Sequence, residues 1–215
     1  MLEIQGITFN SFQVNTYLVW DETGDCLVID PAFYTEEEKS RFKTFVTDHH
    51  LRITGQVNTH CHVDHVLGIR YLKSKYNQPF RAHRGEVSLA ASAHRMGEIF
   101  GLAMDPLPEI EQYVEDEELI SAGKYSLRAL LVPGHSPGSI VLYDPEGAFV
   151  IAGDTLFSGN IGRTDLPGGN HHQLIRSIKT RLLTLPTDTT VYPGHGPSTT
   201  IGKEARENPF LTMAE

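Results

Sequence analysis

Four side chains that can bind a metal ion lie within six positions of the sequence: His60, His62, Asp64 and His65. Imidazole and carboxylate groups suit zinc, iron or manganese. The cluster follows a short apolar run. In an extended segment alternate side chains point to the same side, so His60 and His62 can bind one ion together. This cluster predicts a metal site.

Three later residues share a setting, because each closely follows an apolar run and has a glycine neighbour: His135, Asp154 and His195. Glycine permits close approach of loops, which would let several strand ends converge on one small volume. A single Gly-His is usually a turn and a single Gly-Asp usually a cap, so the prediction rests on the whole set. Five histidines and two aspartates are too many for one tetrahedral ion. They suit two ions that share a carboxylate and a hydroxide.

Such a pair of ions predicts hydrolysis. Two divalent ions would lower the pKa of a shared water, and one ion would polarise the carbonyl group that the bridging hydroxide attacks. A thioester is a sensible substrate, because a thiolate leaves readily and needs no strong general acid. We expect two divalent ions per chain, with zinc ahead of iron and manganese.

The elements that must position these residues show strand-like and helical patterns. Strand-like runs occur at 2–9, 14–20, 26–29, 56–59, 127–132, 139–143, 149–152 and 190–192, with 190–192 expected to be the final strand. Helical spacing occurs at 35–50, 66–76, 86–103 and 174–183, and the second of these places His65 at a helix start. Thr35 and Glu38 form a capping-box pattern. The order of these segments predicts an α/β sandwich.

The length and composition of the chain indicate one domain over residues 1–215. A net charge of −9 argues against a partner bound through nucleic-acid phosphates. The N-terminal residues lack a leader pattern and no apolar run reaches membrane length, so we expect a cytoplasmic protein without a membrane partner. Cys26 and Cys61 are expected to be reduced thiols.

The motifs around the candidate ligands resemble a known family. The sequences Thr59-His60-x-His62-x-Asp64-His65, Pro-Gly-His135, Gly-Asp154-Thr and Gly-His195-Gly are similar to those of the metallo-β-lactamase superfamily. Two longer strings, at 153–169 and 194–210, resemble the short, single-domain glyoxalase II-like (hydroxyacylglutathione hydrolase-like) branch. The resemblance implies an αβ/βα sandwich in which two mixed sheets are flanked by helices.

The resemblance also implies a role for each candidate ligand. The first ion would be held by His60, His62 and His135, and the second by Asp64, His65 and His195. Asp154 would bridge the two ions, and Asp64 would in addition orient the attacking hydroxide as a catalytic residue. Asp30, at the end of the run Leu-Val-Ile-Asp30, resembles a structural acid and stays outside the ligand set.

The chain departs from the larger glyoxalase II pattern in two ways. We expect no C-terminal helical glutathione-binding domain, because only about twenty residues follow His195. Gly196 and Pro197 also stand where those enzymes present a tyrosine to the substrate. Recognition of glutathione is therefore not implied. In the glycine-rich loop after Asp154, Arg163 is a candidate substrate contact, and an ion pair with Asp165 that shapes the loop is the alternative.

The predicted function is a binuclear metal-dependent hydrolase of a small-molecule thioester, such as S-lactoylglutathione or another glutathione conjugate. The alternatives are an iron-dependent persulfide dioxygenase, a nuclease of the same fold, and a catalytically silent binding module. The acidic charge disfavours the nuclease. The methionine and aromatic residues of 86–103 are expected to belong to the core. Structural or surface roles are expected for the remaining histidines: His49, His50, His83, His94, His171 and His172.

Overall fold

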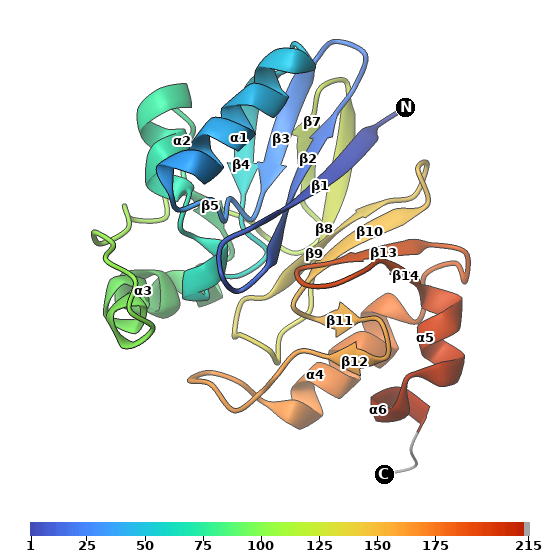
Figure 1. Ribbon diagram of the computed structural model, residues 1–215. Helices are drawn as coiled ribbons and strands as arrows, with labels where there is room; N and C mark the ends of the chain where they lie inside the picture. The colour runs from blue at the N-terminus through green and yellow to red at the C-terminus, as the bar shows by residue number, and fades with distance from the viewer. Residues whose placement is uncertain (213–215) are drawn as a thin grey trace.

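Two β-sheets face each other in the computed structural model, which describes residues 1–212, and helices cover their outer faces (Figure 1). The first sheet has the order β1-β2-β3-β4, with the bounds Glu3–Phe9, Val14–Trp20, Asp25–Ile29 and Arg52–Val57. Its first three strands are antiparallel, whereas β3 and β4 run parallel. The strand-like runs at 2–9, 14–20 and 26–29 are thus confirmed as strands and form an antiparallel meander.

The second sheet has the order β14-β13-β10-β9-β8-β7. In that order the bounds are Thr199–Thr200, Thr190–Pro193, Phe149–Gly153, Ile140–Asp144, Tyr125–Leu131 and Leu119–Ala122. Strands β10 and β13 are parallel and the other neighbours are antiparallel, so both sheets are mixed. Two short pairs lie outside these sheets: β5 (Arg81–Ala82) with β6 (Gln112–Tyr113), and β11 (Leu156–Phe157) with β12 (Asn160–Ile161).

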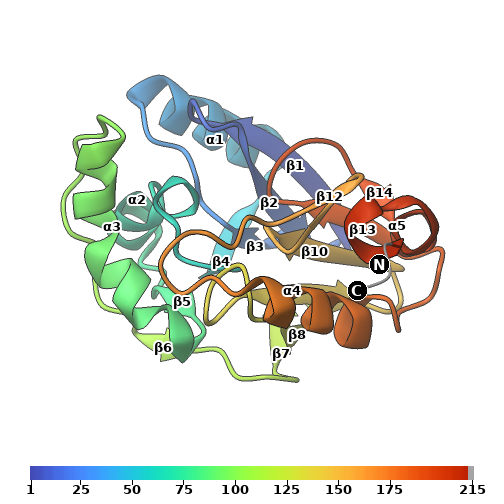
Figure 2. The same ribbon diagram turned by 90° about the horizontal axis from the view of Figure 1, so that it is seen from below.

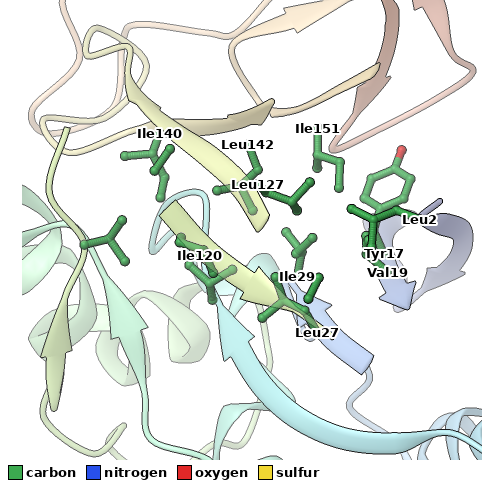
Figure 3. Close-up of a cluster of buried hydrophobic side chains, with 14 of the residues drawn as sticks. Leu2, Tyr17, Val19, Leu27, Ile29, Ile120, Leu127, Ile140, Leu142 and Ile151 are labelled. Atoms are coloured by element: carbon green, nitrogen blue, oxygen red, sulfur yellow. The ribbon is translucent and has the colours of Figure 1, made fainter. Parts of the chain in front are cut away.

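The inner faces of the two sheets form a shared apolar core (Figure 3). Leu27 and Ile29 of the first sheet are fully buried against a layer that contains Leu127, Leu142 and Ile151 of the second. Side chains of a strand alternate between its two faces, so the opposite faces need covers of their own. Both outer faces are therefore apolar as well, which is why strands such as β2 and β9 are buried at every position.

Helices supply those outer covers, as Figure 2 shows from a second direction. Helices α1 (Glu36–Asp48) and α2 (Ile69–Tyr76) pack on the first sheet. The second sheet is covered by α4 (His171–Ser177), the π-helical turn 178–182 and α5 (Ile201–Glu207), with α6 (Pro209–Thr212) next to α5. Helix α3 (Val87–Ile99) lies beside α2 (Figure 2). The predicted αβ/βα sandwich is thus the observed fold.

Helix α1 begins where its sequence predicts. The Thr35 hydroxyl accepts a hydrogen bond from the backbone N–H of Glu38, and the Glu38 carboxylate accepts one from the backbone N–H of Thr35. These bonds satisfy two donors that the first turn would otherwise leave free. Phe42 and Val46, four residues apart, are the buried residues of this helix.

Three sequence predictions about the elements are wrong. The strand at 190–192 is not the last, because β14 follows it and precedes α5. His65 does not begin a helix, since it ends the short 3₁₀ turn Val63–His65 and α2 starts at Ile69. The helix expected at 86–103 ends at Ile99, because Gly101 adopts a left-handed φ of 73° that stops it. Within residues 1–212, no helix is long and apolar enough to cross a membrane.

Candidate metal centre

The seven candidate ligands come from loops that follow four different strands. Strand β4 leads into the segment of His60, His62, Asp64 and His65, and strands β8, β10 and β13 lead to His135, Asp154 and His195. The structure brings all seven together. A backbone contact between Val14 of β2 and His195 also joins the two sheets at this end.

The first group contains His60, His62 and His135, whose nitrogens face one another. His135 Nε2 lies 2.8 Å from His62 Nδ1 and 3.2 Å from His60 Nε2. His60 and His135 are buried, and His62 is largely so. The three ligand nitrogens lie within 4.8 Å of one another, so this group can hold one metal ion.

The second group contains Asp64, His65 and His195. His195 Nε2 lies 3.3 Å from His65 Nε2 and 3.4 Å from Asp64 Oδ2. This group too can hold one ion. Asp154 lies between the groups, with Oδ1 at 3.3 Å from His65 Nε2 and Oδ2 at 3.7 Å from His135 Nε2. Its carboxylate thus lies close to a histidine of each group.

The other ring nitrogen of each of three histidines is fixed by a hydrogen bond. His135 Nδ1 donates to the backbone carbonyl of Arg163 (2.8 Å), and His195 Nδ1 donates to that of Phe12 (3.0 Å). His65 Nδ1 donates to the Asp30 carboxylate (3.0 Å). Carbonyl and carboxylate oxygens only accept, so the proton of each neutral ring must sit on Nδ1, which leaves Nε2 free to bind a metal.

The protonation of the rings in the first group favours a bound cation. Thr59 Oγ1 donates to Asp30, so it must accept from His60 Nδ1, and His60 Nε2 then carries a lone pair. This lone pair faces the lone pair of His135 Nε2. Burial, with His65 and His135 nearby, holds the pKa of His60 well below its usual value, and burial with His135 lowers that of His62 to about 4. Both rings are neutral at pH 7, so a cation is the natural partner for them.

The second group is rich in negative charge. Burial alone would lower the pKa of His195, but Asp154 and Asp64 outweigh burial and raise the pKa to about 9. Burial is likewise outweighed at His65, where the same two carboxylates raise the pKa well above its usual value. In the chain alone, protons on these imidazoles balance the carboxylates. A divalent ion would take over that role.

Asp30 lies outside the seven but supports them. It is buried, and its carboxylate accepts from the backbone N–H (2.7 Å) and the hydroxyl (2.6 Å) of Thr59 as well as from His65.

Glycine is required near Asp154, because a Cβ at Gly162 would collide with the carbonyl of Asp154, and one at Gly194 with the Asp154 carboxylate. Packing against Asp154 thus explains Gly194 beside His195, whereas a Cβ at Gly153 would collide with Thr59 and one at Gly134 with Leu174.

Comparison with known proteins agrees with this geometry. The sequence profile of the Metallo-beta-lactamase superfamily matches residues 10–195. The chain belongs to this superfamily. It is 35% identical to a probable metallo-hydrolase, YqgX, of Bacillus subtilis over 201 residues, which cover 93% of this chain and 92% of that protein. It is 34% identical to the hydroxyacylglutathione hydrolase GloC of Haemophilus influenzae over 217 residues, which cover 98% of each chain.

Among solved structures, TTHA1623 in a di-iron-bound form superposes with a TM-score of 0.86 at 39% identity, and the match covers 96% of this chain and 100% of that one. Membership of this superfamily supports a metal-dependent hydrolase. The structure provides groups of His and Asp side chains that can bind a metal. None of the other six histidines belongs to a metal-capable group within residues 1–212.

A cleft of about 250 Å³ opens over the candidate ligands, five of which line it: His62, Asp64, His135, Asp154 and His195. Helix α3 borders it through Leu89, Ala93 and Met96, and Phe100 follows at the helix end. The prediction that the methionine and aromatic residues of this segment belong to the core is therefore wrong. Phe100 is 49% exposed, and Met96 lines the cleft.

Glu86 is a buried acid that no motif in the sequence marks. Its Oε1 accepts from the Ser136 hydroxyl (2.6 Å) and the backbone N–H of Gly138 (2.7 Å), and its Oε2 accepts from the backbone N–H of Cys61 (2.7 Å). Cys61 separates His60 from His62, and Ser136 follows His135. Glu86 thus ties together the two loops that carry the first group. An acid before an amphipathic helix reads as an ordinary helix start, which gave no signal of this role.

Arg163 lines the cleft and forms an ion pair with Asp165. Its Nε and Nη2 donate to the two oxygens of Asp165, each at 2.8 Å. The side chain of Arg163 is 60% exposed. Its backbone carbonyl meanwhile accepts from His135, so residue 163 supports a candidate ligand through its main chain.

Proposed function

We propose that the protein is a binuclear metal-dependent thioester hydrolase. The observation that carries the proposal is the convergence of five imidazoles and two carboxylates at one cleft, with the ring nitrogens of each group facing one another and Asp154 in contact with both groups. The likeness to the hydroxyacylglutathione hydrolase GloC supports a thioester as the substrate class. The two long motif strings at 153–169 and 194–210 support the same branch.

The proposed assignment gives each ion three protein ligands and one shared ligand. The first ion would bind His60, His62 and His135, the second Asp64, His65 and His195, and Asp154 would serve both. Zinc is the proposed metal, because neutral imidazoles and carboxylates suit it, and the di-iron-bound relative makes iron the alternative. When bound, such ions acidify a water molecule and polarise a carbonyl group.

Asp64 is the proposed catalytic residue of the chain. Burial opposes ionisation of Asp64, but His65 and His195 outweigh it and lower the pKa, so the carboxylate is ionised at neutral pH. It lines the cleft, where Oδ2 can accept a hydrogen bond from the attacking water and orient it. The thiolate leaves without a strong general acid, and none is required of this site.

S-lactoylglutathione is the first substrate to test. A glutathione conjugate carries carboxylates, and Arg163 is the one Lys or Arg side chain that lines the cleft within residues 1–212. We propose that it contacts such a carboxylate, in exchange for its pairing with Asp165. A small-molecule thioester, rather than a nucleic acid or a membrane, is the proposed partner of the site.

The test measures thiol release and oxygen consumption side by side, with protein loaded with zinc or with iron. The proposal predicts thiol release from S-lactoylglutathione without oxygen uptake. His135→Ala should abolish it, whereas His172→Ala, which alters an exposed histidine outside the site, should not. Oxygen uptake with glutathione persulfide, together with intact thioesters, would instead assign the chain to the persulfide dioxygenases.

A further inference from the structure

One wall of the cleft is largely apolar and comes mainly from α3. Ser92 of α3 also lines it, but the Ser92 hydroxyl donates to the backbone carbonyls of Ser88 and Leu89. Leu89, Ala93, Met96 and Phe100 follow one another at spacings of four, three and four residues, so they share one face of the helix. Phe12, in the turn between β1 and β2, adds a fifth side chain. Apolar surface open to a catalytic cleft is a binding surface for an apolar group.

This wall is joined directly to the metal-binding side chains. The rings of Phe12 and Phe100 meet edge to face with centroids 5.4 Å apart, although they come from distant parts of the chain. The carbonyl of Phe12 accepts the hydrogen bond from His195 Nδ1 (3.0 Å). The position of the Phe12 ring is thus coupled to a candidate ligand, so an apolar group on this wall lies next to the reacting carbonyl.

The charged group suited to a substrate carboxylate comes from a different segment. Arg163 precedes Leu166 and Pro167 in the loop that forms another part of the lining. No Lys or Arg occurs among the α3 and Phe12 side chains of the wall. With the carbonyl held over the metal-binding side chains, the charged thiol portion can extend towards Arg163 and the acyl portion along α3.

We propose that the wall formed by Phe12, Leu89, Ala93, Met96 and Phe100 is an acyl-chain site, which makes the enzyme selective for thioesters of apolar, aliphatic or aromatic acids. This inference rests on the proposed thioester hydrolysis and deepens it. A two-carbon acyl group leaves the wall uncovered. A longer chain covers apolar surface that water otherwise contacts, and each added CH₂ contributes to binding of the transition state.

The first test compares S-acetyl-, S-butanoyl- and S-hexanoyl-glutathione as substrates of the metal-loaded protein. The leaving thiol is constant, so kcat/KM reports the acyl group. We expect kcat/KM to rise about twofold to fourfold for each added CH₂. A flat or falling series would overturn the inference, and would leave thioester hydrolysis itself intact.

Variants on adjacent residues identify the wall. Phe100→Ser should reduce the dependence of kcat/KM on chain length, because it removes a cleft-lining ring. Ile99→Ser is the matched control, since Ile99 is 75% exposed and does not line the cleft. It should preserve the chain-length series. An equal loss in both variants would assign the effect to helix stability instead of the acyl contact.

A binding measurement separates this inference from the proposed reaction. Hexanoate, the product of the longest substrate, should bind the metal-loaded protein about tenfold or more tightly than acetate does. If no thioester were hydrolysed but hexanoate still bound more tightly, the proposed function would fail and the apolar site would stand. Equal binding of the two acids would overturn the site.

Discussion

The Glu86 carboxylate accepts a 2.7 Å hydrogen bond from the backbone N–H of Cys61, the residue between His60 and His62. The other oxygen of Glu86 accepts from Ser136 and Gly138, in the loop of His135. A single buried side chain thereby fixes the relative position of the two loops that hold the first group of candidate ligands.

Glu86→Gln should weaken both the fold and the first metal site. A glutamine amide presents one oxygen, so either the bond from Cys61 or the pair from Ser136 and Gly138 is lost. We expect the free energy of unfolding of the metal-free protein to fall by about 1–3 kcal/mol, as measured by urea denaturation. Metal titration should show weaker binding of one ion.

The matched control for this variant is Glu98→Gln, an exposed glutamate on α3. It removes the same charge without touching either loop. If the two variants have equal metal affinity and equal stability, Glu86 does not connect the loops.

Metal binding should depend on pH differently at the two groups. The pKa of His195 is raised to about 9, so a proton occupies this ring at pH 7 and must leave before a metal binds. The pKa of His65 in the same group is raised as well, so the affinity of the second group should rise by at least about tenfold per pH unit from pH 6 to 9. The pKa of His62 is lowered to about 4, so the first group should hold its metal without proton competition down to about pH 5.

Competitive titration with a chromogenic chelator at pH 6, 7, 8 and 9 measures both affinities. The signature is one ion whose affinity is steep in pH and another whose affinity is nearly flat. Two ions with the same pH slope would contradict the assignment of the charged side chains to separate groups.

Arg163→Met should raise KM for S-lactoylglutathione if its guanidinium binds a substrate carboxylate. The increase in KM should be about threefold to tenfold. This is less than a buried ion pair would give, because the Arg163 side chain is exposed and solvent screens its charge. Asp165→Asn should lower KM, since it frees the guanidinium. Both shifts should vanish with a thioester of N-acetylcysteamine, which has no carboxylate.

Arg95→Met serves as the control, because Arg95 is an exposed cation of α3 that does not line the cleft. Unchanged kinetics in Arg163→Met would leave residue 163 with the structural roles seen here: the ion pair with Asp165 and the carbonyl that holds His135.

Local signals in the sequence predicted most of the strands and the set of His and Asp side chains that the fold brings together. The alternation His60-x-His62 and the glycine beside Asp154 reflect constraints that act within a few residues, so they can be recognised without a structure. The capping box of Thr35 is equally local. The sandwich followed from the order of these segments and from the family resemblance.

Contacts between distant segments could not be predicted where no motif marks the residues involved. Glu86 lies 50 residues from Ser136 in the sequence, and only the fold brings them together. The same holds for Phe12 and Phe100, whose contact makes a cleft wall from residues that resemble core. Strand β14 has two residues, which is too short to show a periodic pattern.

The most direct test of a binuclear hydrolase is a metal titration of the metal-free protein that records thiol release from S-lactoylglutathione at each addition. The account predicts that activity rises until about two ions per chain are present and then stays constant. Asp154→Ala, which removes the shared carboxylate, should lower occupancy of both sites. A plateau at one ion per chain, or no thiol release at any loading, would contradict the account.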